Sequence, residues 1–181
     1  MANDRSLIRR LRRGDLDALG EIYQEHKDRL LTLAICLLPD RSAAEDCLQD
    51  VFLKLARDPV GSRVRRNLKR YLSSCVLNRA RDELRKAGRH VLLGEESAGG
   101  TEHLAPNPSE RLEGMEEALR IQHALARLPQ QQREVVVLHL QEGLTFRRIA
   151  ALQSVSINTA QSRYRYGIQR LRELLSWREA L

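Results

Sequence analysis

The chain has 181 residues, of which 42% are hydrophobic, and a formal net charge of +7 at pH 7. This length and the differing character of the two ends favour two small domains, and the positive charge favours a polyanionic partner. The N-terminus lacks the apolar core of a signal peptide, and no apolar run approaches the roughly 20 residues that cross a bilayer. These features argue against membrane insertion, and we expect a cytoplasmic location.

The charge is distributed unevenly along the chain. Residues 60–90 carry ten Lys and Arg against two acidic residues, whereas residues 91–117 carry seven Glu against one Arg. The C-terminal part is basic again. This order predicts two nucleic-acid contacts joined by an acidic segment that avoids the phosphates or mimics them.

No constellation of residues in the sequence resembles an active site or a metal centre. Cys36, Cys47 and Cys75 lie far apart among apolar residues, and we expect them to be reduced core residues. His residues are scattered, there is no glycine-rich phosphate loop, and carboxylates occur only as surface charge on helices. We therefore expect no catalysis, no metal and no cofactor.

Helical periodicity dominates the N-terminal half, and the alternation typical of strands is hard to find, so an all-α fold is predicted. Proline and glycine residues separate the predicted helices. These helices cover residues 6–13, 16–38, 43–57 and 68–88.

The predicted helix over residues 43–57 follows Ser42, a candidate N-cap. Its apolar stripe should be buried and consists of Ala44, Cys47, Leu48, Val51 and Leu55. Its outward side holds Glu45, Asp46, Gln49 and Asp50, with Phe52 at the edge of the stripe. An acidic patch beside an exposed aromatic ring can dock a basic partner helix. From this segment alone, a solvated helix with acids near its N-terminus is the simpler interpretation.

The predicted helix over residues 68–88 has a cationic side. Its inward residues are Leu68, Leu72, Cys75, Val76, Ala80 and Leu84, and its outward ridge consists of Asn78, Arg81, Asp82, Arg85 and Arg89. Such a ridge suits a nucleic-acid backbone, and the preceding Arg57–Arg66 loop can fold around an unstacked base. The alternative is a basic helix that is merely solvated.

Residues 91–117 are rich in Gly, Ser, Pro and Glu and offer little to bury, which predicts a flexible tether. A structured acidic arm that occupies a channel is the alternative.

The segment Glu142–Leu175 has the pattern of a helix-turn-helix. The first helix should begin at Thr145 and bury Ile149, Ala150 and Leu152, and the second should begin after the candidate N-cap Ser156. Apolar residues of the second helix recur at steps of three or four: Ile157, Ala160, Tyr164, Ile168, Leu171 and Leu175. The opposite face carries groups suited to base edges and phosphates: Asn158, Gln161, Ser162, Arg165 and Gln169. An ordinary helical hairpin with a solvated face is the alternative.

Four stretches, in this order and separation, resemble a known family: Gly14–Leu31, Ala44–Arg57, Tyr71–Arg85 and Ala124–Ala150, the last followed by NTAQSRYRYGIQRLR. The chain resembles the bacterial RNA polymerase sigma factors of the small extracytoplasmic-function (ECF) group, within the sigma-70-like family. The resemblance implies a promoter-melting domain, region 2, over residues 1–90. It also implies a flexible acidic linker over residues 91–117 and a helix-turn-helix domain, region 4, over residues 118–181.

The resemblance implies a non-enzymatic subunit that binds core RNA polymerase and directs promoter-specific initiation. Its partners would be promoter DNA, the clamp helices of the polymerase's largest subunit and the flap of the second-largest subunit. An anti-sigma protein is a further candidate partner. The residues implied for polymerase docking are Glu45, Asp46, Gln49, Asp50 and Phe52, which reverses the simpler interpretation of that helix.

The resemblance also implies two sets of DNA-binding residues. The non-template strand of the start-proximal element, with one base extruded, would contact Arg63, Arg65, Arg66, Asn78, Arg81 and Arg85. The distal element would contact Arg147, Asn158, Gln161, Ser162, Arg163 and Arg165. Of these, Gln161, Ser162 and Arg165 would lie closest to bases, whereas Arg147 and Arg163, together with Arg148, would bind phosphates or form structural ion pairs.

The chain departs from the family pattern at several positions. Arg148 replaces the usual glutamate before Ile-Ala, and Ser154 stands at the turn where many members have glycine. Tyr71 is the only aromatic residue between Leu53 and Arg89, so stacking on unpaired bases should be weak and promoters stringent. Two rival functions remain at this point: a stand-alone regulator whose N-terminal domain binds a ligand or dimerises, and an enzyme that acts on nucleic acid.

Overall fold

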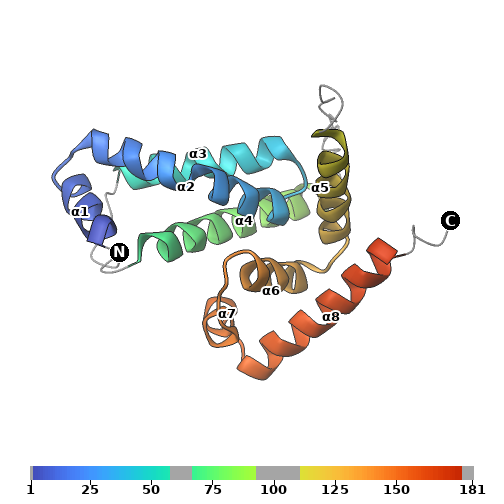
Figure 1. The fold of residues 1–181 in the computed structure, drawn as a ribbon. Helices are drawn as coiled ribbons and strands as arrows, with labels where there is room; N and C mark the ends of the chain where they lie inside the picture. Colours follow the sequence, from blue (N-terminus) through green and yellow to red (C-terminus); the bar gives the residue numbers. More distant parts are fainter. Residues whose placement is uncertain (1, 58–66, 93–110, 177–181) are drawn as a thin grey trace. The chain divides into compact units, whose positions relative to one another are not determined.

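The computed structural model describes residues 2–57, 67–92 and 111–176, and the described residues contain helices and no strands (Figure 1). The helices are α1 (Ala2–Leu11), α2 (Leu16–Leu37), α3 (Arg41–Arg57), α4 (Leu68–Leu92), α5 (Arg111–Ala126), α6 (Gln130–Leu140), α7 (Phe146–Gln153) and α8 (Ile157–Ser176). The all-α prediction is confirmed. The chain divides into two compact units, residues 1–94 and 95–181, and each is described by itself.

The N-terminal unit is built around α2, which packs against α1, α3 and α4, while α3 and α4 also pack against each other (Figure 1). Side chains from these helices form one apolar core, in which Ile22, Leu30, Leu55 and Leu72 are fully buried. The first helix differs from its predicted range of 6–13. It ends at Leu11. Gly14, three residues later, has a positive φ of 82°, and its N–H donates to the Leu11 carbonyl at 3.0 Å.

Aspartate side chains accept hydrogen bonds from the free N–H groups at the starts of α2, α3 and α4. Asp15 caps α2 by accepting from the backbone N–H of Asp17 at 3.0 Å. The predicted N-cap Ser42 is wrong: Asp40 accepts from the Ala43 N–H at 2.8 Å, because its carboxylate stands just before the first turn, where free N–H groups are found. At the start of α4, Asp4 of α1 accepts from the Leu68 N–H at 3.2 Å. This hydrogen bond joins the first and last helices of the N-terminal unit.

The C-terminal unit has α8 as its central element, with α5, α6 and α7 packed against it. Val135, Val136, Leu138 and Ile149 fill its core. Residues 93–110 of the predicted flexible linker lie outside the described residues, but the prediction is wrong at both ends, because residues 91–92 end α4 and residues 111–117 begin α5. None of the described helices combines the length and the apolar character needed to cross a membrane.

A tight turn and a ring cluster fix where α7 begins. Gly143 has a φ of 64°, and the Leu144 N–H donates to the Leu138 carbonyl at 3.1 Å. His139 Nδ1 lies 2.8 Å from the Leu144 oxygen. The His139 ring stacks on Phe146 with centroids 4.3 Å apart and meets the Tyr164 ring edge-on at 4.9 Å. These contacts join α6, α7 and α8 at one point.

The first prediction concerns Gly167, where α8 lies close against α6. A Cβ built there would lie 2.8 Å from Cγ2 of Val136, a β-branched side chain that is 2% exposed. We expect Gly167→Ala to lower the free energy of unfolding of the C-terminal unit by about 1–3 kcal/mol through overpacking, despite the better helix propensity of alanine. Urea denaturation measures this effect.

Gly20 in α2 provides the matched control, because nothing lies within 4 Å of a Cβ built there. Gly20→Ala should raise stability by about 0.5–1 kcal/mol. Stabilisation by both substitutions would contradict the close crossing at Gly167, and Val136→Ala should relieve the Gly167→Ala defect.

The second prediction concerns His26, which is 6% exposed and whose Nε2 has no hydrogen-bond partner among the residues that the structure describes. Burial lowers the pKa of His26 below the usual value of 6.5, while the neighbouring charges of Glu25 and Arg29 oppose each other. Between its folded pKa and its unfolded pKa, His26 therefore binds fewer protons in the folded chain than in the unfolded chain. Its contribution to the free energy of unfolding is fully present above pH 6.5 and is lost as the pH falls towards the folded pKa.

We expect His26→Leu to weaken this pH dependence. Urea denaturation of the intact chain at about pH 7.5 and about pH 5.5, above and below the unfolded pKa, should show a smaller loss of stability for the variant than for the native chain. An identical loss in both proteins would show that His26 does not titrate on unfolding in this range.

Candidate nucleic-acid interface

The two helices of the predicted helix-turn-helix are α7 and α8. The Ser156 hydroxyl accepts from the Thr159 N–H at 3.0 Å, so Ser156 is the N-cap of α8 as predicted. Thr145 precedes α7, also as predicted, but its side chain makes no capping hydrogen bond. The polar face of α8 is open to solvent: Asn158, Gln161, Arg165 and Gln169 are exposed, and Ser162 is half-buried. Arg147 and Arg148 of α7 are exposed too.

The turn between α7 and α8 contains Ser154 in the left-handed conformation, with φ 55° and ψ 44°. The Val155 N–H donates to the Ala150 carbonyl at 3.0 Å and closes the end of α7. A residue with a Cβ accepts this conformation at a cost of about 1–2 kcal/mol. The turn therefore keeps the backbone geometry that glycine favours, although this chain has serine there.

The buried stripe of α8 is narrower than the predicted one: Tyr164, Ile168 and Leu175 are half-buried, and two further residues depart from the pattern. Ile157 is 44% exposed, and Gly167 is buried although the pattern omitted it. Burial centres on Ala160, Gly167 and Leu171, and at 100° per residue Ile157 lies about 60° from that line, at the first residue of the helix. Leu152 of α7 is half-buried rather than buried. A glycine within the apolar stripe was the available signal for a close helix crossing.

A buried polar network, which the sequence pattern did not reveal, lies beneath this pair of helices. Glu134 of α6 is 4% exposed and accepts from Gln130 Nε2 at 3.1 Å and from Gln153 Nε2 at 3.0 Å. Gln153 in turn accepts from Arg163 Nη1 at 2.8 Å. Arg163, predicted to bind phosphate or form a structural ion pair, is thus held by a neutral amide.

The predicted docking face of α3 is open, with one correction. Glu45, Asp46, Gln49 and Asp50 are exposed as expected. The expectation of an exposed Phe52 is wrong: it is 8% exposed, because the Tyr23 ring of α2 meets it edge-on with centroids 4.9 Å apart. Leu53, the next residue along the helix, is 53% exposed and supplies the apolar part of this face.

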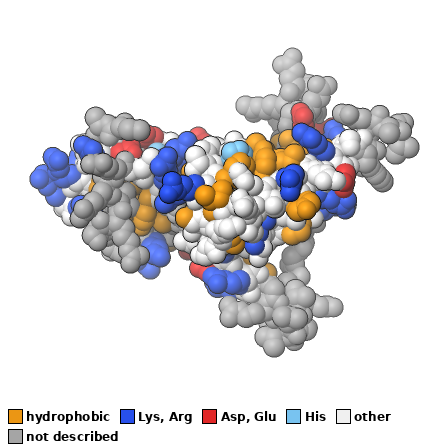
Figure 2. All heavy atoms as spheres, turned by 90° about the horizontal axis from the view of Figure 1, so that it is seen from below, with side chains coloured by type: hydrophobic (Ala, Val, Ile, Leu, Met, Phe, Trp, Pro, Cys, Tyr) orange, Lys and Arg blue, Asp and Glu red, His pale blue; other side chains and the backbone are white. Residues whose placement is uncertain are grey.

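Lys and Arg side chains are more prominent than Asp and Glu side chains on the face shown in Figure 2. On α4, however, several cations have acidic partners. Arg85 pairs with Asp82, and Arg79 pairs with Asp50 at 2.6 Å and with Glu83 at 2.5 Å. The hydrogen bonds to Asp50 and then Glu83 raise the pKa of Arg79, which stays charged.

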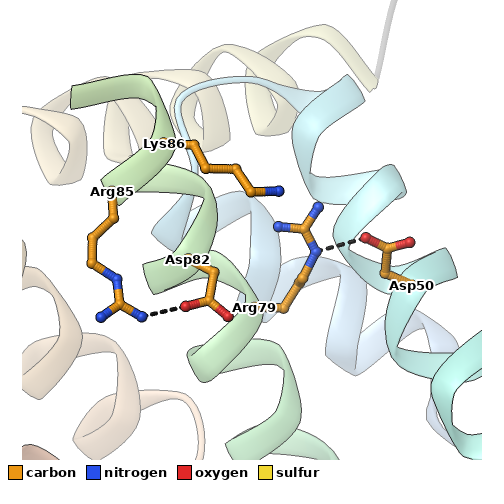
Figure 3. A pocket seen from close by; sticks show the side chains of 5 residues that line it. All are labelled: Asp50, Arg79, Asp82, Arg85 and Lys86. Atoms are coloured by element: carbon orange, nitrogen blue, oxygen red, sulfur yellow. Dashed lines mark hydrogen bonds and ion pairs between the residues drawn. The ribbon is translucent and has the colours of Figure 1, made fainter. Parts of the chain in front are cut away.

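Asp50, Arg79, Asp82 and Arg85 line an open pocket between α3 and α4, where the Arg79 side chain points towards Asp50 and Arg85 towards Asp82 (Figure 3). Lys86 also lines this pocket, and its Nζ is 3.9 Å from Glu83. The Arg79 pairing with Glu83 follows an i,i+4 spacing that the sequence displays, but its bond to Asp50 depends on how α3 and α4 pack.

Asn78 is exposed and Arg81 is half-buried on α4. The predicted DNA-binding residues Arg63, Arg65 and Arg66, like the side chain of Arg89, lie outside the described residues. The ridge is therefore a mixed surface in which Asp82 and Glu83 compensate part of the positive charge.

The cysteines have core surroundings. Cys47 is buried, Cys36 and Cys75 are half-buried, and burial raises the pKa of all three thiols, that of Cys47 to about 11. Within the described parts of the chain, no group of three His, Cys, Asp or Glu side chains is placed to hold a metal ion.

Comparison with known proteins identifies the family. Residues 22–90 match Sigma-70 region 2, and residues 118–171 match Sigma-70, region 4. The RNA polymerase sigma factor CarQ of Myxococcus xanthus is 31% identical over 170 residues, which cover 93% of this chain and 95% of CarQ. The ECF RNA polymerase sigma factor SigW of Bacillus subtilis is 26% identical over 177 residues, which cover 93% of this chain and 94% of SigW.

Two solved structures share the fold. The sigma factor RpoE of Bartonella quintana, solved with the anti-sigma factor NepR, has a TM-score of 0.63 and 28% identity, with 86% of this chain and 97% of that chain covered. CnrH, solved with the cytosolic domain of CnrY, has a TM-score of 0.66 and 22% identity, with 96% and 97% covered. The chain belongs to the sigma-70 family of RNA polymerase sigma factors, in its ECF group, and directs promoter-specific transcription initiation.

Proposed function

We propose that this sigma factor is non-catalytic and works by two contacts with DNA and one with core polymerase. Residues 1–90 act as region 2, residues 118–181 act as region 4, and the segment between them, whose last residues from 111 on belong to α5, links them. The observation that carries the proposal is the asymmetry of α8, whose apolar side is buried while its polar side is open. A helix exposed in this way after a tight turn is the element that helix-turn-helix proteins place in the major groove.

Region 4 would read the distal promoter element through the open face of α8. Gln161 and Ser162 carry donors and acceptors for base edges, and Arg165 can bind guanine with two hydrogen bonds. The Arg165 guanidinium lies 5.7 Å from the centre of the Tyr166 ring, which helps to order a long side chain. Arg147 on α7 is exposed and suited to a phosphate.

Region 2 would dock on the clamp helices of the largest polymerase subunit through α3. The exposed acids give electrostatic complementarity to a basic helix, and Leu53 adds an apolar contact among them. The exposed side of α4 around Asn78 would then hold the non-template strand with one base flipped out of the stack.

Action on RNA polymerase implies work in the cytoplasm. An anti-sigma protein is a further proposed partner. The support comes from the solved sigma factor RpoE, which has the same fold and is in complex with the anti-sigma factor NepR; CnrH, which also shares the fold, is in complex with the cytosolic domain of CnrY. Transcripts that begin in vitro with core polymerase plus this protein would establish initiation and map the promoter. No specific transcripts and no polymerase binding would overturn the proposal in favour of a stand-alone regulator.

The third prediction tests polymerase docking at Asp46. Asp50 already pairs with Arg79, so reversal of its charge would also disturb the N-terminal unit, and Asp46 is the cleaner position. We expect Asp46→Arg to weaken binding to core polymerase by at least about tenfold, because a cation then faces the basic partner helix. Asp28→Arg on the exposed side of α2 makes the same charge change as a control. Equal affinities of both variants and the native chain would place the contact elsewhere.

The fourth prediction separates promoter opening from promoter binding. Asn78→Ala should reduce permanganate reactivity of the opened strand by about tenfold, since a lost hydrogen bond to a flipped base costs on the order of 1–2 kcal/mol. Closed-complex affinity in a gel shift should change much less. Ser74→Ala, one turn earlier on α4, is the control. Equal losses in both assays would assign Asn78 to initial binding.

A further inference from the structure

Gln153, the last residue of α7, lies between two charged side chains. Its Nε2 donates to Glu134 Oε2 and to the Gln131 carbonyl, both at 3.0 Å. Its Oε1 accepts from Arg163 Nη1 at 2.8 Å. One side chain therefore connects α6, α7 and α8 directly before the Ser154 turn.

The chemistry of the three groups determines which way the amide faces. A guanidinium only donates hydrogen bonds and a carboxylate only accepts them, so the amide oxygen must face Arg163 and the amide nitrogen must face Glu134. Glu134 is buried, and its other oxygen accepts from Gln130 Nε2 at 3.1 Å. The charge of Glu134 also acts on the neighbouring Arg133. The carboxylate of the network thus belongs to α6, and the Gln153 amide lies between it and Arg163 of α8.

Within the described residues, Arg163 is thus positioned by a neutral amide rather than by a carboxylate. A glutamate at position 153 would form an ion pair with Arg163, and its carboxylate would also repel Glu134. The neutral amide instead fixes the guanidinium through one hydrogen bond and leaves its charge for another partner. Arg163 follows Ser162 on α8 and lies on the side that faces α7, the helix that crosses the DNA backbone in helix-turn-helix complexes.

We propose that Gln153 is a positioning residue that holds Arg163 against a phosphate of the distal promoter element and leaves its positive charge uncompensated. This inference rests on the proposed DNA-reading role of region 4. It predicts that Gln153 affects promoter affinity through Arg163 alone.

A double-mutant cycle tests the positioning role. The affinity of the reconstituted holoenzyme for a fluorescent duplex carrying the mapped promoter is measured for the native chain, Gln153→Met, Arg163→Gln and the double variant. We expect Gln153→Met to weaken binding by about three- to tenfold in the native background, and to have no effect when Arg163 is already Gln. The same loss in both backgrounds would show a structural role only and overturn the inference.

The salt dependence of the same binding reaction tests the charge. Arg163→Gln should lower the slope of log affinity against log salt by about one, the value for one phosphate contact. The exchange variant Glu134→Gln with Gln153→Glu puts a carboxylate against Arg163 while it removes the buried charge, and it should lower the slope by a similar amount. An unchanged slope in either protein would overturn the inference.

Two controls complete the experiment. Circular dichroism of each variant at the assay temperature shows that it is folded, and the Gln153→Met cycle decides the question if the exchange variant is not. Failure of the native holoenzyme to bind the promoter or to start transcripts would refute the proposed function itself. Normal initiation with an additive cycle would refute only the role of Gln153.

Discussion

The close crossing of α6 and α8 at Gly167 determines which side of α8 is available for recognition. With only a hydrogen in place of a side chain, Gly167 lets Val136 of α6 approach the backbone of α8. The buried stripe then runs through Ala160, Gly167 and Leu171, and the polar side chains are left on the opposite side. The ring cluster of His139, Phe146 and Tyr164 holds α7 in the same assembly. The proposed recognition face therefore depends on packing between residues that are not among the proposed DNA contacts.

Charge organises the N-terminal unit in a different way. Its positive residues are numerous, but Arg79 forms ion pairs with Asp50 and Glu83, and Arg85 forms one with Asp82. Exposed ion pairs of this kind contribute at most about 1 kcal/mol to stability. Their larger consequence is to lower the positive potential of α4, and under the proposed function this would limit binding to arbitrary DNA and leave more of the selection to groups such as Asn78.

The Arg79–Asp50 pair also connects the proposed polymerase-facing helix with the proposed promoter-facing helix (Figure 3). The polar network of Glu134, Gln153 and Arg163 makes a similar connection in the C-terminal unit. In both units a few short polar contacts, rather than apolar packing alone, fix side chains that the proposed function requires. Such contacts have strict geometric demands, so they orient their members more precisely than nonpolar contacts do.

The sequence alone was enough to predict an all-α fold, most helix ranges, the Ser156 cap, the exposed acidic face of α3 and the family. These features depend on local periodicity and on residues close together in the chain, which a pattern records directly. Tertiary packing decided the rest. Tyr23 covers Phe52 and leaves Leu53 exposed, Val136 requires a glycine at position 167, and Gln153 reaches Glu134 and Arg163. Each of these contacts joins residues on different helices, and the spacing of residues within one helix cannot specify how it crosses another.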